Sequence, residues 1–228
     1  FPINSTVFIL FTTSVFLGDL GGLVVGNSAI RSAAAQDELI TPDSEFVKAM
    51  VRPAVKYLKE NYRKKAEYGN ASLVGLAIFN AGLRLGKSKR ELKADPVLVE
   101  ILDRVSEEVL SVTADGERTV YAACVTGLLL AEVDENKYDR EINHILNFLY
   151  QRQQPHGGWG YKKEPTGDTS QTQYASLFLW LAKEKKFQVK RSAVEGAIKF
   201  LIGTQHASGG FVYKAKPGEV YGKTTQSL

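Results

Sequence analysis

The stretch QRQQPHGGWGY, residues 151–161, has a second copy 52 residues later in GTQHASGGFVY, residues 203–213. Both copies place a Gln, a Gly-Gly pair, an aromatic residue and a Tyr in the same register. A further match follows with three extra residues in the second copy, because GDTSQT at 167–172 corresponds to GKTTQS at 222–227. Self-similarity at a fixed interval is typical of repeat proteins, in which each unit packs against its neighbours. The sequence therefore predicts a stack of similar units, with this motif as the loop of each.

Two kinds of helical pattern alternate around these loops. One kind is apolar on nearly every side, which indicates a helix surrounded by others; its segments are 72–85, 119–133 and 172–182. The other kind is apolar along one stripe and is expected to lie outside; its segments are 96–112, 140–152 and 191–202, the last with Val194, Ala197, Ile198 and Leu201 on its stripe. A helical segment at 46–62 contains Pro53, where a helix starts or bends. We predict an all-α fold of stacked helical hairpins.

The residue types of the repeated motif fit a loop between helices. A Gly-Gly pair allows a tight turn, because glycine adopts positive φ at little cost. The amides of Gln153 and Gln205 can satisfy open backbone groups, and the aromatic residue can pack in the seam between hairpins. His156, at a position where the second copy has Ser208, is expected to be exposed. Asp168 or Thr169 is expected to cap the helix that follows.

Composition restricts the classes of function. The 228 residues are 44% hydrophobic and 24% charged, which is typical of a globular chain. The net charge of +4 comes from Lys and Arg scattered among Asp and Glu, so we predict no nucleic-acid partner. Cys124 is the single cysteine, so the chain has no internal disulfide and no cysteine-based metal framework.

The N-terminal part is expected to direct export. Residues 7–26 are almost wholly apolar, and Ala33 and Ala35 follow as an A-x-A cleavage site. Residues 1–35 are predicted to be a signal peptide or a membrane anchor, and the protein to be periplasmic, in the cell envelope or secreted. Any contact with a membrane is expected only through this segment, if it stays uncleaved. The remaining boundaries are a linker at 36–45 and a repeat domain at 46–228, with repeats near 46–90, 96–135, 141–190 and 192–228, the last truncated, so we expect a longer natural protein.

The repeated motif resembles a known family. QRQQPHGGWGY is similar to the QW-type repeat of the prenyltransferase and squalene oxidase superfamily, and GDTSQTQYASLFLW resembles the helix start that follows this repeat in squalene–hopene cyclases. The resemblance is strong over 141–228 and faint over 46–135. It implies an α/α toroid of inner and outer helices, here incomplete, a fold that also serves other chemistries.

The catalytic groups of the enzymes in this superfamily are not found in the chain. Squalene–hopene cyclases carry an Asp-x-Asp-Asp-Thr motif; here Asp168 falls on its last Asp and Gly167 on its proton donor. Protein prenyltransferases carry an Asp-x-Cys zinc ligand pair, whereas Ala122 stands two residues before Cys124. Cys124 is therefore interpreted as a buried apolar residue. The adjacent carboxylates Glu107-Glu108 and Asp134-Glu135 are interpreted as solvated surface. We predict no metal, no cofactor and no catalytic residue in this chain.

Two functions remain open at this point. The first is a non-catalytic binding or scaffold module that holds an apolar ligand or an envelope protein in the toroid cavity. The alternative is a terpenoid cyclase of the squalene-cyclase type, or a prenyltransferase, whose catalytic residues lie outside this chain. A site is expected where loops and inner-helix starts converge, and the helix N-termini there would suit an anionic or polar group. The candidate residues are Trp159, Tyr161, Asp168, Thr169, Gln171, Tyr174, Tyr213 and Gln226.

Overall fold

A computed structural model describes residues 41, 43–62, 67–116, 119–162, 164–206 and 208–215. The predicted N-terminal signal or anchor and the site candidate Gln226 lie outside these residues. The chain divides into two compact units, residues 1–56 and 57–228, and each is described by itself.

Helix α3, Glu45–Asn61, begins in the first unit and ends in the second. Pro53 lies inside it, and the helix continues on both sides of this residue. The helix starts beside the predicted boundary at residue 46, and its described residues include none that is buried. Its acidic first turn at Glu45 and basic last turn at Lys59 complement the helix dipole.

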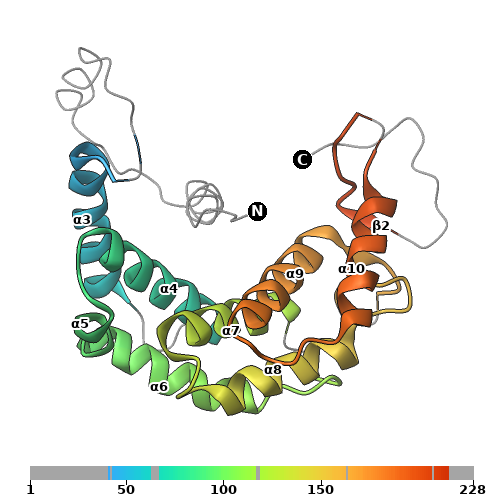
Figure 1. The fold of residues 1–228 in the computed structure, drawn as a ribbon, viewed down its shortest axis with the longest axis horizontal. Helices are drawn as coiled ribbons and strands as arrows, with labels where there is room; N and C mark the ends of the chain where they lie inside the picture. The colour runs from blue at the N-terminus through green and yellow to red at the C-terminus, as the bar shows by residue number, and fades with distance from the viewer. Residues whose placement is uncertain are drawn as a thin grey trace. The chain divides into compact units, whose positions relative to one another are not determined.

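The second unit is made almost entirely of helices, so the predicted all-α class is confirmed (Figure 1). Each predicted helical segment of this unit is a helix, with ends shifted by a few residues. Its elements are α4 (Tyr68–Arg84), α5 (Lys89–Lys93), α6 (Pro96–Leu110), α7 (Val120–Asp134), α8 (Asp139–Arg152), β1 (Gly167–Asp168), α9 (Thr169–Glu184), α10 (Arg191–Thr204) and β2 (Lys214–Ala215).

Helices α4, α7 and α9 form a central row, with α7 between the other two (Figure 1). Glycines allow the close approach: Leu129 of α7 lies against Gly75 of α4, and Phe178 of α9 lies against Gly127 of α7. The other helices pack on this row, with α6 against α4, α8 against α7, and α10 against α9. Helix α7 is buried on all sides, as its uniformly apolar sequence predicts.

The helix starts are capped by residues that favour this position. Thr119 caps α7 and Asp168 caps α9, each by accepting from the backbone N–H three residues on. Asp95 caps α6 in the same way. The short helix α5 was not predicted from periodicity, but a capping box of Ser88 and Glu91 marks its start.

Two predictions of burial are wrong in part. Helix α9 is not enclosed on every side, since Trp180 is 45% exposed. In α10 the apolar stripe does not face the core as a whole, because Ala197 is buried whereas Val194 and Ile198 are exposed. Apolar periodicity identifies an apolar face, but it does not report whether another element covers that face.

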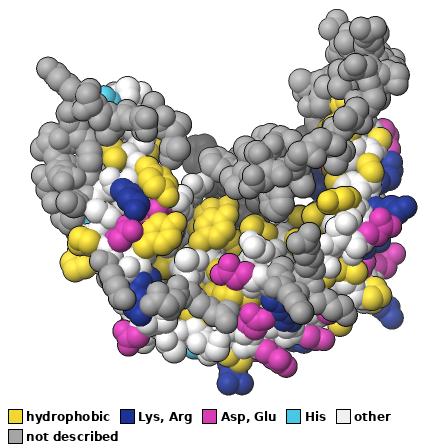
Figure 2. Space-filling model, turned by 180° about the vertical axis from the view of Figure 1, so that it is seen from behind, with side chains coloured by type: hydrophobic (Ala, Val, Ile, Leu, Met, Phe, Trp, Pro, Cys, Tyr) yellow, Lys and Arg dark blue, Asp and Glu magenta, His cyan; other side chains and the backbone are white. Residues whose placement is uncertain are grey.

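The surface carries both signs of charge. Lys and Arg side chains are interspersed with Asp and Glu on the face shown in Figure 2. Across the described part of the chain, no helix combines the length and hydropathy needed to cross a bilayer.

Candidate functional site

The first copy of the loop closes on itself after α8. The N–H of Gln154 donates to the carbonyl of Gly158 at 3.0 Å, and the N–H of Gly157 donates to the carbonyl of Gln154 at 2.8 Å. Gly157 has a φ of +93°, as predicted for the Gly pair. Nε2 of Gln153 donates to the carbonyls of Gly157 and Ala193, at 2.8 Å each, so its predicted role is confirmed.

The side chain of His156 packs within this loop and is only partly exposed to solvent. Its Nδ1 accepts from the N–H of Gly158 at 3.0 Å, and its ring lies 5.0 Å from that of Phe200. Burial lowers the pKa of His156, and the side chain is half-buried. The predicted exposure of His156 is therefore wrong, because α10 packs over the loop.

The second copy of the loop has the same backbone geometry. The N–H of His206 donates to the carbonyl of Gly210 at 2.7 Å, and the N–H of Gly209 donates to that of His206 at 2.8 Å. Gly209 has a φ of +90°. Nε2 of Gln205 donates to the carbonyl of Gly209 at 3.4 Å. The repeated sequence thus encodes a repeated turn.

The second loop copy lies against the start of α9. Strands β1 and β2 pair antiparallel, with Asp168 opposite Lys214. Thr169 is held by two carbonyls of the second copy: its N–H donates to Tyr213 at 2.9 Å and its hydroxyl to Val212 at 2.5 Å. Residues more than forty positions apart therefore build the cluster at this helix start.

Two polar side chains in the first turn of α9 are buried with atoms that lack partners. Asp168 is 1% exposed; its Oδ1 accepts from the N–H of Gln171 at 2.9 Å and from the hydroxyl of Ser170 at 2.6 Å. Among the described residues its other oxygen, Oδ2, has no hydrogen bond of normal geometry, and the hydroxyl of Tyr213 lies near this carboxylate. Gln171 is 2% exposed, and neither its Oε1 nor its Nε2 has a hydrogen-bond partner in the described part of the chain. Buried polar atoms are nearly always paired, so these three mark the helix start as unusual.

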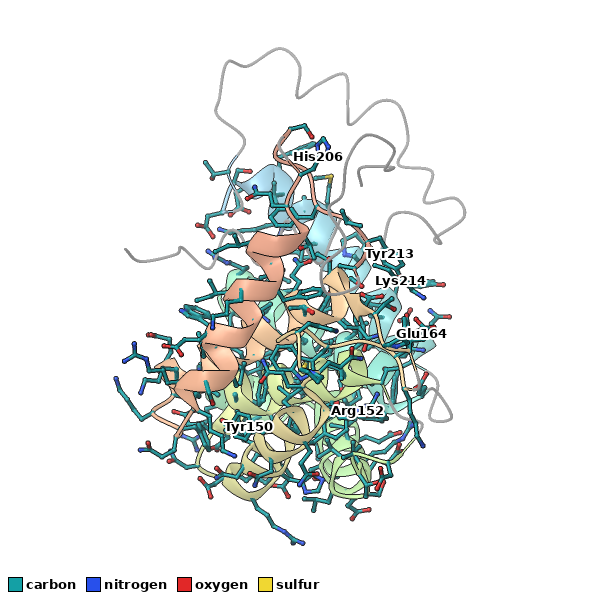
Figure 3. The ribbon with its side chains drawn as sticks, turned by 90° about the vertical axis from the view of Figure 1, so that its right-hand side faces the viewer. Tyr150, Arg152, Glu164, His206, Tyr213 and Lys214 are labelled. Atoms are coloured by element: carbon teal, nitrogen blue, oxygen red, sulfur yellow. The ribbon has the colours of Figure 1, made fainter. Side chains whose placement is uncertain are left out.

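Exposed tyrosines and an ion pair lie beside these buried groups. Tyr161 is 40% exposed and Tyr213 is 42% exposed. Nζ of Lys214 lies 2.7 Å from Oε2 of Glu164 and 5.4 Å from the ring centre of Tyr161. Tyr213, Lys214 and Glu164 lie in one region of the molecule (Figure 3). The negative charge of Asp168, with smaller contributions from burial and Tyr161, raises the pKa of Tyr213 to about 12.

The remaining site candidates lie apart from this cluster or serve the core. Trp159 is completely buried, and its Nε1 donates to the carbonyl of Leu149 at 2.9 Å, as expected for an aromatic residue in the seam. Tyr174 pairs with Tyr121 of α7, the hydroxyls 3.1 Å apart and the ring centres 4.2 Å apart. Of the eight candidates, the structure brings together Tyr161, Asp168, Thr169, Gln171 and Tyr213.

Glu164 and Lys214 belong to the cluster although the sequence did not single them out as site residues. The position of Lys214 in the motif was visible, since it aligns with Lys162 of the first copy. Nothing in the pattern distinguishes Glu164, because its contact with Lys214 spans 50 residues.

The positions that the sequence resemblance aligned with catalytic groups are occupied differently here. A Cβ on Gly167 would overlap the ring of Phe200 and lie 2.7 Å from Cε1 of His156, so a side chain at this position would require both rings to move. Cys124 is completely buried, as predicted, and burial raises the pKa of its thiol. The described residues contain no group of three or more His, Cys, Asp or Glu side chains arranged to hold a metal ion.

The adjacent carboxylates form surface ion pairs rather than a facing pair. Oε1 of Glu108 lies 2.7 Å from Nε of Arg104, and Oδ2 of Asp134 lies 2.6 Å from Nζ of Lys93. Glu135 pairs with Lys185 at 3.3 Å. These contacts agree with the interpretation as solvated surface.

Comparison with known proteins adds no relative. No family model matches the chain, and no curated protein or solved structure matches it either.

Proposed function

We propose that this chain is an exported repeat module of the α/α-toroid type and that it binds a ligand without transforming it. The resemblance of its motif to the prenyltransferase and squalene oxidase superfamily supports the fold, as does the central row of α4, α7 and α9. The observation that carries the function is the group of unpartnered buried atoms on Asp168 and Gln171.

The energetic argument concerns these atoms. A buried donor or acceptor without a partner costs about 1–3 kcal/mol, and here three such atoms lie in one helical turn. Natural sequences retain destabilising groups of this kind mainly at functional sites. These atoms are buried in the structure, so a ligand reaches them only through a local opening of the helix start; by donating to Oδ2 of Asp168 and both donating to and accepting from the amide of Gln171 it would then remove the cost.

The chemistry of the cluster favours a neutral ligand. Asp168 and Glu164 are acidic, and the N–H groups of Thr169 and Gln171 already donate within the protein. An anion would therefore meet carboxylates and few free donors, contrary to the anionic group that the helix start alone suggested. Hydroxyl and amide groups fit the buried atoms, and the exposed rings of Tyr161 and Tyr213 offer faces for an apolar ring surface.

The lack of space at Gly167 supports binding over catalysis. In the resemblance to squalene–hopene cyclases this residue takes the place of the proton-donating Asp, and the ring of Phe200 fills the volume that a side chain would need. An enzyme of this class would therefore need its acid elsewhere in a longer chain.

A titration with an N-acetylated sugar, tri-N-acetylchitotriose, tests the proposal, because it presents hydroxyls, amides and apolar ring faces. We expect calorimetry to show binding to the parent chain. Gln171→Leu should abolish binding and raise the melting temperature, since it removes unpartnered polar atoms. Gln173→Leu, on the exposed side of the same helix, is the matched control and should leave binding unchanged.

Other outcomes would count against the proposal. If Gln171→Leu lowers the melting temperature, the amide is structural and the cluster is not a ligand site. If the parent chain ignores the sugar but converts squalene, the cyclase alternative is correct.

A further inference from the structure

Helix α10 repeats helix α8 with a shift of 52 residues, and both helices have 14 residues. The two differ in what covers them. Ile142 and Leu146 of α8 are 0% and 2% exposed, whereas their equivalents in α10, Val194 and Ile198, are 37% and 50% exposed. One face is therefore covered in the first copy and open in the second.

The loops that follow these helices differ in the same way. Trp159 of the first copy is completely buried, whereas its equivalent Phe211 is 40% exposed. A Cβ on Gly157 would overlap the backbone of Gly196, whereas a Cβ on Gly209 would have no atom within 4 Å. The second loop thus has the same backbone turn as the first, but its aromatic residue and its first glycine are not covered by another described element.

The first copy shows what covers such a loop. The first three turns of α10 lie on it, with Gly196 against Gly157 and the ring of Phe200 against Gly158. Gln153 reaches across to the carbonyl of Ala193 at 2.8 Å. Small residues at the start of the covering helix and a Phe one turn later are therefore the features that this contact requires.

We propose that the α10 face, defined here as Val194, Ile198, Ile202, Gly209 and Phe211, is a docking surface for the next hairpin of the same repeat, joined in series after α10. The occupant is a helix pair of the α9–α10 type, whose outer helix begins with small residues. Ile202, at 69% exposed, makes the face unlike the polar outer surface that ends a repeat array. This proposal does not depend on the ligand proposed for the start of α9.

The sequence beyond the face fits this occupant. GKTTQS at 222–227 matches GDTSQT at 167–172, in which α9 begins. A chain that continued in the pattern of α9 and α10 would therefore place a matching hairpin next to the α10 face, as in the preceding repeat.

The test adds the occupant to the protein. A second copy of residues 174–215, joined after Leu228, continues the register because Ser227 aligns with Thr172. Hydrogen exchange is then compared between the parent and the extended chain. We expect exchange in α10 and in 208–213 to slow at least ten-fold in the extended chain, because contacts that close a face suppress local opening.

Two variants separate docking from a general effect on folding. Ile198→Glu in the extended chain should restore the parent rates, whereas Ser192→Glu, which adds the same charge on another face of α10, should leave the protection in place. In the parent chain Ile198→Glu should change the melting temperature little, since half of the Ile198 side chain is already exposed there.

Three results would overturn the proposal. The first is unchanged exchange in α10 of the extended chain, and the second is protection that survives Ile198→Glu. The third is a dimer of the parent chain in sedimentation that Ile198→Glu dissociates, which would assign the face to a second copy of this chain.

Discussion

Gly157 and Gly196 touch backbone to backbone, so that a single methyl group on Gly157 would overlap the carbonyl of Gly196. The contact joins the loop after α8 to the second turn of α10. Because neither residue has a side chain, the loop and the helix can approach more closely here than larger residues would allow.

Alanine substitution of the two equivalent glycines should separate strain from packing. Gly209→Ala carries only the cost of positive φ, about 1–2 kcal/mol of unfolding free energy. Gly157→Ala adds overlap with Gly196 and should cost more than about 3 kcal/mol in total. Urea unfolding of both variants measures the difference. Equal costs would show that the contact can relax.

The aromatic positions of the two loops offer a second matched comparison. Trp159→Ala should lower the unfolding free energy by about 3–5 kcal/mol, because the ring is completely buried and its N–H is paired. Phe211→Ala should cost less than about 1 kcal/mol, because the ring is 40% exposed. Thermal unfolding of both variants checks this order, and a larger loss for Phe211→Ala would contradict it.

The hydroxyl pair between α4 and α7 makes a prediction about coupling. Ser72 and Thr126 lie 2.6 Å apart, and each hydroxyl also donates to a backbone carbonyl of its own helix at 2.9 Å. The two hydroxyl hydrogens cannot make all three hydrogen bonds at once. Ser72→Ala and Thr126→Val should therefore each lower the unfolding free energy by about 1 kcal/mol. A double-mutant cycle should give a coupling below about 0.5 kcal/mol. A larger value would mean that the contact between the hydroxyls dominates.

The charge of Asp168 should be visible in the titration of Tyr213. The pKa of this tyrosine is raised to about 12, chiefly by the charge of Asp168, from an ordinary value of 10.0. Asp168→Asn keeps a good helix cap and removes the charge, so the pKa of Tyr213 should fall towards its ordinary value. The ultraviolet absorbance of tyrosinate reports the change, and Tyr213→Phe assigns the signal. An unchanged titration curve in Asp168→Asn would place the two groups further apart.

Acid stability should depend on Asp95, which caps α6 and pairs with Lys59. Burial alone would raise the pKa of Asp95, but the hydrogen bond and charge of Lys59, together with backbone N–H groups, lower it below 3.8. The folded state then binds the proton less well than the unfolded state, so the stabilisation is present above about pH 4 and is lost as the pH falls through the folded pKa. Asp95→Asn should flatten this part of a stability curve measured in urea between about pH 2 and 6.

The helices and their caps could be predicted from sequence because they depend on local patterns. Apolar periodicity located α6 to α10. Asp168 or Thr169 was expected as the cap of α9, because a capping side chain reaches only three residues along the chain, and the structure assigns the cap to Asp168. The roles of Gln153 and of the Gly pair followed from the same short range. Helix α5 was not predicted, because five residues are too few to show a helical period.

The candidate site was only partly predictable, since its contacts join distant segments. Trp159 was grouped with the site because it is aromatic and near Tyr161, but the fold turns its ring into the core. The pairing of β1 with β2 brings Tyr213 and Lys214 to α9 and has no sequence pattern of its own. That the amide of Gln171 has no partner among the residues that the structure describes depends on the position of every neighbouring side chain, so no sequence motif could predict it.

The two hydrogen bonds that Thr169 donates to the second loop copy have a consequence for synthesis on the ribosome. The carbonyls of Val212 and Tyr213, which anchor the first residue of α9, are translated more than forty residues after it. A nascent chain that has emerged only as far as α9 therefore lacks these two contacts, and the start of α9 is held only by its local cap, Asp168. The pairing of the helix start with Lys214–Ala215 can form only after this strand has left the exit tunnel.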